Sequence, residues 1–263
     1  VAVLAADAAD KAAALAADGD PAQLLGVLRA SAGSQHPELV VAVLSELGKT
    51  PPQRPVNPKE ALDALRQILR SSNQPLAGSA LPLAVAWDSD RSFYNDCVNV
   101  STVLQHRAGD AALPEETRVD AIRTLVAARS FSPKILDKLL ELFRGELPDG
   151  IAKELISELA TTGDPTVGTA LIERYPALPP GQQETAFTAL VSRSGFATLL
   201  LDAVEAKKFD PAKLAPGQIS RLTSHPDAAI AKRSSARFGG AISKDEIIAR
   251  LLPEIEKPGD IAK

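Results

Sequence analysis

Three aspartates lie close together in the segment AWDSDRSFYND, and carboxylate clusters of this kind can bind calcium. They are Asp88, Asp90 and Asp96. A calcium loop of the EF-hand type also needs a central glycine and a terminal glutamate, and this segment has neither. We therefore expect no metal here, and we expect Asp88 or Asp90 to cap the helix that follows. Trp87, the only tryptophan, is expected to pack at a helix end rather than to form a ligand platform.

The three histidines do not form a metal-binding pattern. His36, His106 and His225 are far apart in sequence, and none has the spacing of a ligand pair. His36 and His225 each precede a proline at a predicted helix start, where a local capping role explains them. The sequence therefore predicts no metal ligand among them.

The potential nucleophiles also lack a catalytic motif. Cys97 is the only cysteine, so it cannot form an internal disulfide, and its neighbours Val98 and Val100 indicate a buried thiol. Ser192 and Ser194 do not lie in a G-x-S-x-G sequence. We predict no catalytic residue in the chain and expect that it is not an enzyme.

The most concentrated charge lies in the segment AAIAKRSSARF near the C-terminal end. Arg233 and Arg237 are four residues apart and share a helix face, with Lys232 adjacent. These three side chains are the candidate docking patch for an acidic partner. The alternative is an ordinary solvated helix face whose apolar side packs on the preceding hairpin.

The composition limits the class of function. The chain has 263 residues, 45% hydrophobic and 4% aromatic, no methionine, a net charge of −4 and a pI of about 5.5. An acidic chain argues against a nucleic-acid-binding surface, which needs a concentrated positive field. No apolar run approaches the roughly 20 residues that span a bilayer, so we expect a soluble protein without membrane insertion. The absence of an initial methionine and the ending IEKPGDIAK suggest a fragment of something longer.

The helices that must position these residues have a recurring start signal, a capping side chain followed by proline. It occurs at Asp20, Asn57, Ser132 and Asp164. With less clear starts, the spacing is roughly 31 to 42 residues, the range of HEAT or armadillo helical hairpins. No segment alternates with period two, so we predict no significant sheet. The predicted fold is all-α, an α-α superhelix of about five or six hairpins.

The region from Leu178 to Phe238 shows the pattern most clearly. Two short amphipathic helices separated near Gly195 predict an antiparallel hairpin. Their expected buried stripes are Ala186, Phe187 and Leu190, then Phe196, Leu199, Leu200 and Ala203.

We expect one continuous solenoid with three parts. Residues 1–56 form irregular N-terminal helical hairpins, residues 57–240 the HEAT-like array, and residues 241–263 a terminal helix and linker. The proline-rich stretch from Gly48 to Pro58 is expected to be an extended, rigid connection.

Three segments also resemble a known family: GDAALPEETRVDAIRTL, then TTGDPTVGTALIERYPALPPGQQETAFTALVSR, then LLLDAVEAKKFDPAKLAPGQISRLTSHPDAAIAKRSSARF. They are similar to the HEAT-repeat segment of large planctomycete-type membrane-bound dehydrogenase proteins. These proteins typically pair a dehydrogenase-like β-propeller with a C-terminal cytochrome c-like haem domain. The resemblance covers about Leu83 to Lys263 and implies a periplasmic or cell-envelope location. Covalent haem needs a C-x-x-C-H motif, which this chain lacks, so haem is expected only in a following domain and no cofactor in this chain.

The sequence thus favours a non-catalytic helical-repeat scaffold or spacer that docks protein domains, in cis or in trans. The expected partners are cytochrome-like or dehydrogenase-like domains, and not nucleic acid. One alternative is a solenoid enzyme such as a HEAT-type DNA glycosylase or lyase, which needs a basic groove, aromatic residues and a placed carboxylate. Another is an engineered or isolated repeat scaffold.

Overall fold

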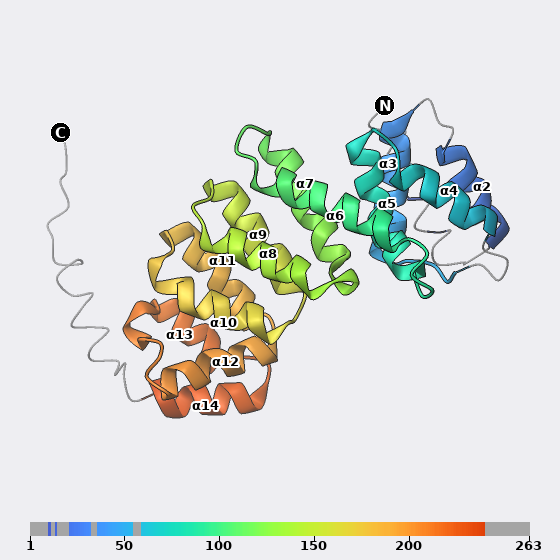
Figure 1. Cartoon of the computed structure of the whole chain (residues 1–263). Coiled ribbons are helices and arrows are strands. Elements are labelled where there is room, and N and C mark those ends of the chain that lie inside the picture. The colour runs from blue at the N-terminus through green and yellow to red at the C-terminus, as the bar shows by residue number, and fades with distance from the viewer. Residues whose placement is uncertain (1–9, 12–13, 15–20, 33–35, 55–58, 240–263) are drawn as a thin grey trace, which may run out of the picture. The chain divides into compact units, whose positions relative to one another are not determined.

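A computed structural model describes residues 10–11, 14, 21–32, 36–54 and 59–239 (Figure 1). Across these residues the regular structure is entirely helical, with no strand, so the predicted all-α class is confirmed. The α-helices are α2 (Pro21–Ala32), α3 (Pro37–Lys49), α4 (Lys59–Leu69), α5 (Gln74–Trp87), α6 (Tyr94–Gly109), α7 (Glu115–Ala127), α8 (Pro133–Arg144), α9 (Asp149–Thr161), α10 (Pro165–Arg174), α11 (Pro180–Val191), α12 (Ser194–Glu205), α13 (Pro216–Thr223) and α14 (Ala228–Phe238). Three short 3-10 helices lie between them, η1 (Arg129–Phe131), η2 (Tyr175–Ala177) and η3 (Pro211–Lys213).

The chain divides into two compact units, residues 1–158 and 159–263. The division falls in the last turn of α9. The boundaries expected from the sequence, after residues 56 and 240, lie outside the described residues, and so does the predicted terminal helix of 241–263.

Unit 1 is built in two layers of helices. Helix α2 packs against α4, α4 against α6, and α6 against α8, while α3 packs against α5 and α5 against α7 (Figure 1). Helices that follow each other in the chain, such as α6 and α7, join the two layers. From α4 to α8 each helix therefore contacts the next helix, and α2 to α6 each contact the next but one, which is consistent with a helical repeat.

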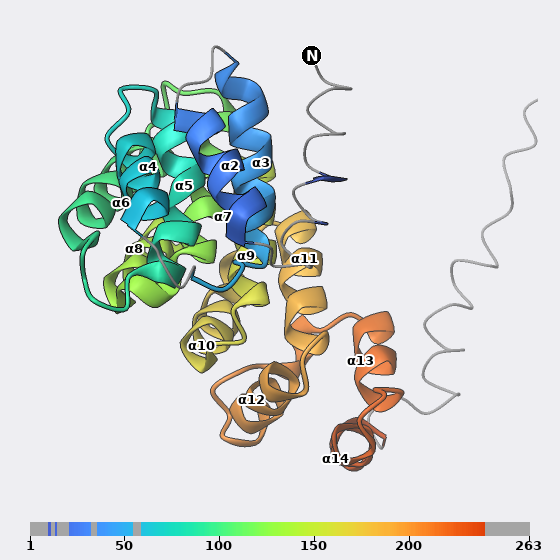
Figure 2. The same cartoon turned by 90° about the vertical axis from the view of Figure 1, so that its right-hand side faces the viewer.

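Unit 2 has the same alternation. Helix α12 packs against α10 and α14, and α11 packs against α13. Figure 2 shows α14 nearly end-on, whereas α11 and α13 are seen from the side, so α14 crosses the direction of these two helices. The chain direction changes by 111° between α11 and α12. Helices α11 and α12 therefore cross at a steep angle and do not form the antiparallel hairpin predicted from the sequence.

Hydrogen bonds between separate helical pairs recur at a nearly constant separation in sequence. Most of those that involve a side chain link residues 31 to 37 positions apart, which is close to the repeat length predicted from the helix starts. Such bonds tie each repeat to the next rather than to distant parts of the chain. Examples are Arg29 with Glu60, Trp87 with Pro52, Arg123 with Glu154, Arg193 with Ala160, Gln218 with Glu184, His225 with Val191, and Arg233 with Asp202.

Two of the four predicted pairs of a capping residue and a proline lie in the described residues, and both caps are confirmed. The side chains of Ser132 and Asp164 accept hydrogen bonds from the backbone N–H two positions later, at 3.3 and 2.8 Å. Each satisfies one of the amides that a helix start leaves without an intrahelical partner. Asp20 and Asn57 lie outside the described residues.

The predicted apolar stripe of α11 is confirmed, because Ala186, Phe187 and Leu190 are all fully buried. The stripe of α12 is displaced. Leu199 is only half-buried, whereas Leu201 is fully buried. The buried face of α12 is Phe196, Ala197, Leu200, Leu201 and Val204.

Trp87 packs at the end of α5, as predicted, with 1% of its surface exposed. Its indole N–H donates a hydrogen bond of 2.8 Å to the backbone carbonyl of Pro52. This bond fixes the described part of the proline-rich connection, residues 50–54, against the helical layers. Because its N–H has an acceptor, the buried indole contributes apolar contact area and leaves no hydrogen-bond donor unsatisfied.

In the described part of the chain, no single helix is long and apolar enough to cross a membrane. One pair of helices, α11 with α12, reaches the required length and composition only when both are counted together across their 111° bend.

Arg193, between α11 and α12, closes the C-terminal end of α9. Its Nε and Nη2 donate hydrogen bonds of 2.8 and 2.7 Å to the carbonyls of Ala160 and Thr161. Gly163 follows with a positive φ of 68°, the conformation that commonly ends a helix. We expect Arg193→Met to lower the free energy of unfolding by about 1 kcal/mol, because a partly exposed, charge-assisted pair is lost.

The matched control is Arg193→Lys. Lysine keeps the charge but cannot donate to both carbonyls from one planar group. Urea denaturation should place it between the wild type and Arg193→Met. Full stability in Arg193→Met would show that the cap contributes nothing.

Candidate docking groove

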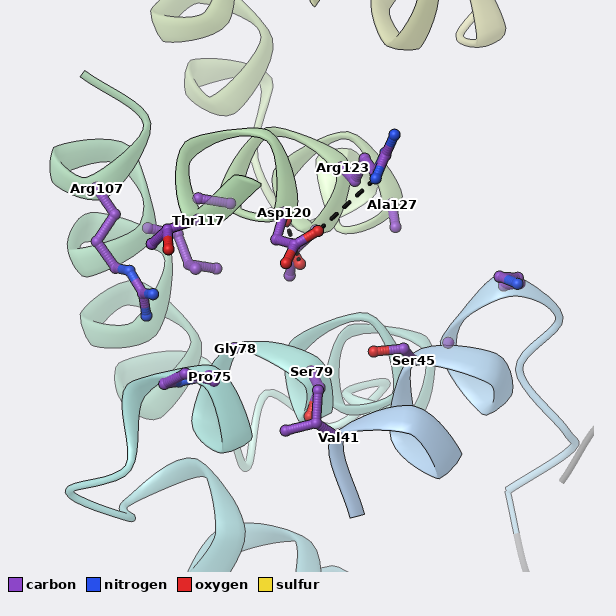
Figure 3. Close-up of a pocket in the computed structure, with 15 residues that line it drawn as sticks. Val41, Ser45, Pro75, Gly78, Ser79, Arg107, Thr117, Asp120, Arg123 and Ala127 are labelled. Atoms are coloured by element: carbon purple, nitrogen blue, oxygen red, sulfur yellow. Dashed lines mark hydrogen bonds and ion pairs between the residues drawn. The ribbon is translucent and has the colours of Figure 1, made fainter. Parts of the chain in front are cut away.

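A hollow with mainly apolar walls lies in unit 1, between α3, α5, α6 and α7 (Figure 3). It has a volume of about 330 Å³. We call it the α5 groove, because α5 lies between its two walls. The residues that line it are Val41, Ser45, Gly48, Lys49, Pro75, Gly78, Ser79, Leu104, Arg107, Thr117, Asp120, Ala121, Arg123, Thr124 and Ala127.

Small side chains give the groove its depth. Helix α5 contains no charged residue, and it contributes Pro75, Gly78 and Ser79 to the floor. A Cβ atom on Gly78 would lie 3.2 Å from Leu104, so glycine allows α5 and α6 to pack closely there. Gly48 plays the same part between α3 and α5. Larger residues at these positions would push the helices apart.

Charged side chains stand at the edges. Arg123 donates hydrogen bonds of 2.8 Å to Glu154 and 3.1 Å to Glu158 of α9, and its Nη1 lies 3.7 Å from Asp120. Arg107 appears in no ion pair within the described residues. Figure 3 shows Arg107 at one end of the opening and Arg123 at the other. Of these two arginines, Arg123 is neutralised by the glutamates of α9, and Arg107 is not.

Lys49, also on the rim, contacts Glu46 at 2.5 Å. Asp120 is the one carboxylate among the lining residues. Partial burial raises its pKa, while the charges of Arg123 and Arg107 oppose the rise. Because 66% of this side chain is exposed, water screens these effects.

The aspartates of the sequence cluster do not converge on a metal site. Asp88 accepts a 2.7 Å hydrogen bond from the N–H of Phe93, the residue before α6, but no side chain caps the first turn of α6, so the capping role predicted for Asp88 or Asp90 is wrong. Asp90 pairs with Arg54 at 2.7 Å, and this bond is the main cause of its lowered pKa of about 2. Among the described residues no group of three or more histidine, cysteine or carboxylate side chains could hold a metal ion.

Asp96 binds arginines instead. It is 9% exposed and accepts a 2.8 Å hydrogen bond from Arg70, and Arg66 lies 3.7 Å away. Arg66 belongs to α4, and Arg70 directly follows its last residue. Asp96 therefore joins α4 to α6 and has a structural role.

The histidines lie in separate places. The Nδ1 of His225 accepts the N–H of Asp227 at 3.0 Å, and its Nε2 lies 3.0 Å from the carbonyl of Val191. These contacts connect the loop before α14 to the end of α11, while Asp227 and not His225 caps α14, so the capping role predicted for His225 is wrong. His36 precedes α3 without a side-chain capping bond, so the capping role predicted for it is wrong. His106 lies exposed in the last turn of α6.

The potential nucleophiles are structural. Cys97 is fully buried, and this burial raises the pKa of its thiol to about 12, so it stays protonated. The Ser192 hydroxyl donates to the carbonyl of Ala189 at 2.9 Å. Ser194 is the first residue of α12.

The candidate basic patch is divided between two roles. Arg233 makes bonds of 2.6 Å to Glu205 and 2.5 Å to Asp202, both on α12. These carboxylates raise its pKa further and hold α14 against α12. Lys232 and Arg237 are exposed. The structure therefore leaves two of the three side chains at the surface of unit 2.

Sequence reasoning missed the α5 groove. The available signal was the charge-free segment from Gln74 to Trp87, in which glycine, alanine, serine and proline are frequent. This composition is typical of a buried helix, and Ala77 to Ala84 of α5 are all buried. The segment therefore identifies the helix that forms the floor, but not the groove itself.

The fold and the groove define an all-α protein of stacked helices with a recessed apolar surface on one layer. The sequence matches no protein-family model. Comparisons with curated proteins and with solved structures gave no significant match.

Proposed function

We propose that the chain is a non-catalytic helical-repeat scaffold that binds a segment of a partner protein in the α5 groove. The groove itself carries this proposal. Four helices, α3, α5, α6 and α7, line an apolar recess of about 330 Å³, and its floor, formed by α5, has no charge. Recesses of this size with a few polar edge groups are typical binding sites.

The hydrogen bonds at repeat spacing support the spacer role. Bonds such as Gln218 with Glu184 and Trp87 with Pro52 connect each repeat to the preceding one. A chain braced in this way resists bending within each unit and can hold an attached domain at a fixed distance. By resemblance, we propose cytochrome-like or dehydrogenase-like domains as the partners, in a periplasmic or cell-envelope setting.

One observation favours a second candidate, a groove enzyme of the glycosylase type. Asp120 lies in the groove with Arg107 and Arg123 on either side, which is a carboxylate in a basic setting. However, none of the lining residues is aromatic, and a flipped base is normally held by stacking. Duplex DNA binding that weakens steeply with salt and is lost in Arg107→Gln would favour the enzyme.

The docking proposal is tested by filling the groove. Ala127 is exposed and lies on the groove wall, so Ala127→Trp should obstruct it without disturbing the core. The probe is a purified cytochrome c-type domain carrying a fluorescent label. We expect it to bind the wild-type chain, and we expect Ala127→Trp to weaken binding at least tenfold in an anisotropy titration.

Ala236→Trp is the matched control. Ala236 is also exposed on a helix, but it lies on α14 in unit 2. Its variant should bind like the wild type. Equal binding by Ala127→Trp would contradict the groove as the docking site, and no binding by the wild type would contradict a cytochrome partner.

A further inference from the structure

We propose that the α5 groove binds an amphipathic α-helix whose apolar side chains enter the groove and whose carboxylate pairs with Arg107. This inference rests on the proposed docking function and names its partner. It follows from the shape of the walls, from the hydrogen bonds that the groove hydroxyls already make and from the distribution of charge.

The walls have the form of helical stripes. Helix α7 contributes residues from Thr117 to Ala127, at spacings of three and four, and α3 contributes Val41, Ser45 and Gly48. Ten residues of α-helix extend about 15 Å, so the recess is long enough for roughly three helical turns. A helix laid between two such stripes can pack its ridges against both.

An extended peptide fits the groove poorly. Its backbone N–H and C=O groups would need partners, and no asparagine or glutamine is among the lining residues. Of the four hydroxyl side chains in the lining, those of Ser79 and Thr124 already donate to carbonyls of their own helices, at 2.9 and 2.8 Å, so few groups are left to pair with an extended backbone. A helix satisfies its own backbone and needs only apolar contact with the walls.

The lining also predicts which side chains enter. Glycine, alanine and serine leave the volume of the groove to the partner, so we expect leucine-sized anchors at positions i, i+4 and i+7 of the bound helix. Leu104 and Val41 offer apolar contact to these anchors.

Charge fixes the direction of the helix. Arg123 is already paired with Glu154 and Glu158, and Lys49 with Glu46. Arg107, at the opposite end from Arg123, appears in no ion pair of the described chain (Figure 3). A carboxylate on the partner is attracted to the Arg107 end and repelled by Asp120 along the groove.

The test uses the full chain and three labelled synthetic peptides of 14 residues. The first carries leucines at the anchor positions and one glutamate beyond them, the second has glutamine in place of the glutamate, and the third has a central proline. We expect the glutamate peptide to bind about two- to fivefold tighter than the glutamine peptide, as for a partly exposed ion pair. The proline peptide should bind at least tenfold more weakly, because proline breaks the helix.

Variants of Arg107 isolate the ion pair. Arg107→Gln should remove the difference between the first two peptides and leave the affinity of the glutamine peptide unchanged. Arg107→Glu should prefer a lysine peptide over the glutamate peptide, which a merely structural role of Arg107 would not produce.

Several results would overturn the inference. The first is equal binding of the glutamate and glutamine peptides to the wild type, and the second is undiminished binding of the proline peptide. The third is self-association of the wild type that Ala127→Trp abolishes, because a second copy would then be the occupant of the groove. If the cytochrome domain binds and Ala127→Trp blocks it while no peptide binds, the helix is wrong and the docking function stands. If neither binds, both fail.

Discussion

Replacing Leu201 by alanine is expected to lower the free energy of unfolding of unit 2 by about 2 to 5 kcal/mol. Leu201 is fully buried in α12, which packs against both α10 and α14. Truncation removes apolar contacts and leaves a cavity that two neighbouring helices cannot both close. Leu199→Ala should cost only about 1 kcal/mol, because the Leu199 side chain is half-buried.

The measurement is urea denaturation followed by two signals. Far-UV circular dichroism reports all helices, whereas Trp87, the only tryptophan, reports unit 1. Loss of dichroism at lower urea with an unchanged fluorescence transition would assign the damage to unit 2. Repeat arrays need not unfold in one step, so both signals are required. Equal costs for the two variants would favour the stripe predicted from the sequence over the face seen in the structure.

The two leucines also show where sequence reasoning reaches its limit. The run Leu199-Leu200-Leu201 is apolar at every position, so more than one helical stripe fits it. The choice is made by contact with α10 and α14, which bury a wide face including Ala197 and Val204. Periodicity identifies the helix, and its neighbours determine which side is buried.

Local features could be predicted because their causes are local. The caps at Ser132 and Asp164 depend on a side chain and an amide two residues away. The buried thiol of Cys97 and the packing of Trp87 follow from apolar neighbours on the same helix. These predictions needed no knowledge of the tertiary structure.

The α5 groove could not be predicted in the same way. Its lining comes from four helices between Val41 and Ala127, and its volume depends on which side chains are too small to fill it. The role of Arg233 also depends on distant residues, since its partners lie 28 and 31 positions earlier in the chain. Sequence spacing placed it on a solvated face with Arg237, but α12 supplies carboxylates that spacing alone does not show.

A second large loss of stability is expected from Gln218→Ala, about 2 to 4 kcal/mol. The side chain of Gln218 is central to a polar network in unit 2. Its Oε1 accepts hydrogen bonds of 2.9 Å from the Tyr175 hydroxyl and 3.0 Å from the N–H of Ala215, and its Nε2 donates at 2.8 Å to Glu184. Tyr175 is 1% exposed, so its hydroxyl would be left buried without a partner.

Two further facts support this magnitude. Burial raises the pKa of Tyr175, so the phenol remains a hydrogen-bond donor throughout the neutral range. Glu184 also accepts a 2.7 Å bond from Arg221, whose guanidinium lies 5.1 Å from the centre of the Phe187 ring. The network therefore connects η2, α11 and α13, and one substitution affects all three elements.

A double-mutant cycle separates the unpaired phenol from lost packing. Gln218→Leu retains bulk, and Tyr175→Phe removes only the hydroxyl. In the wild type, Tyr175→Phe should cost about 1 kcal/mol by loss of one hydrogen bond. In the Gln218→Leu background it should cost nothing or restore stability, because it removes a buried donor that has no acceptor. Additive losses in urea denaturation would mean that the 2.9 Å contact contributes no coupling, and that η2 and α13 are held together by apolar packing alone.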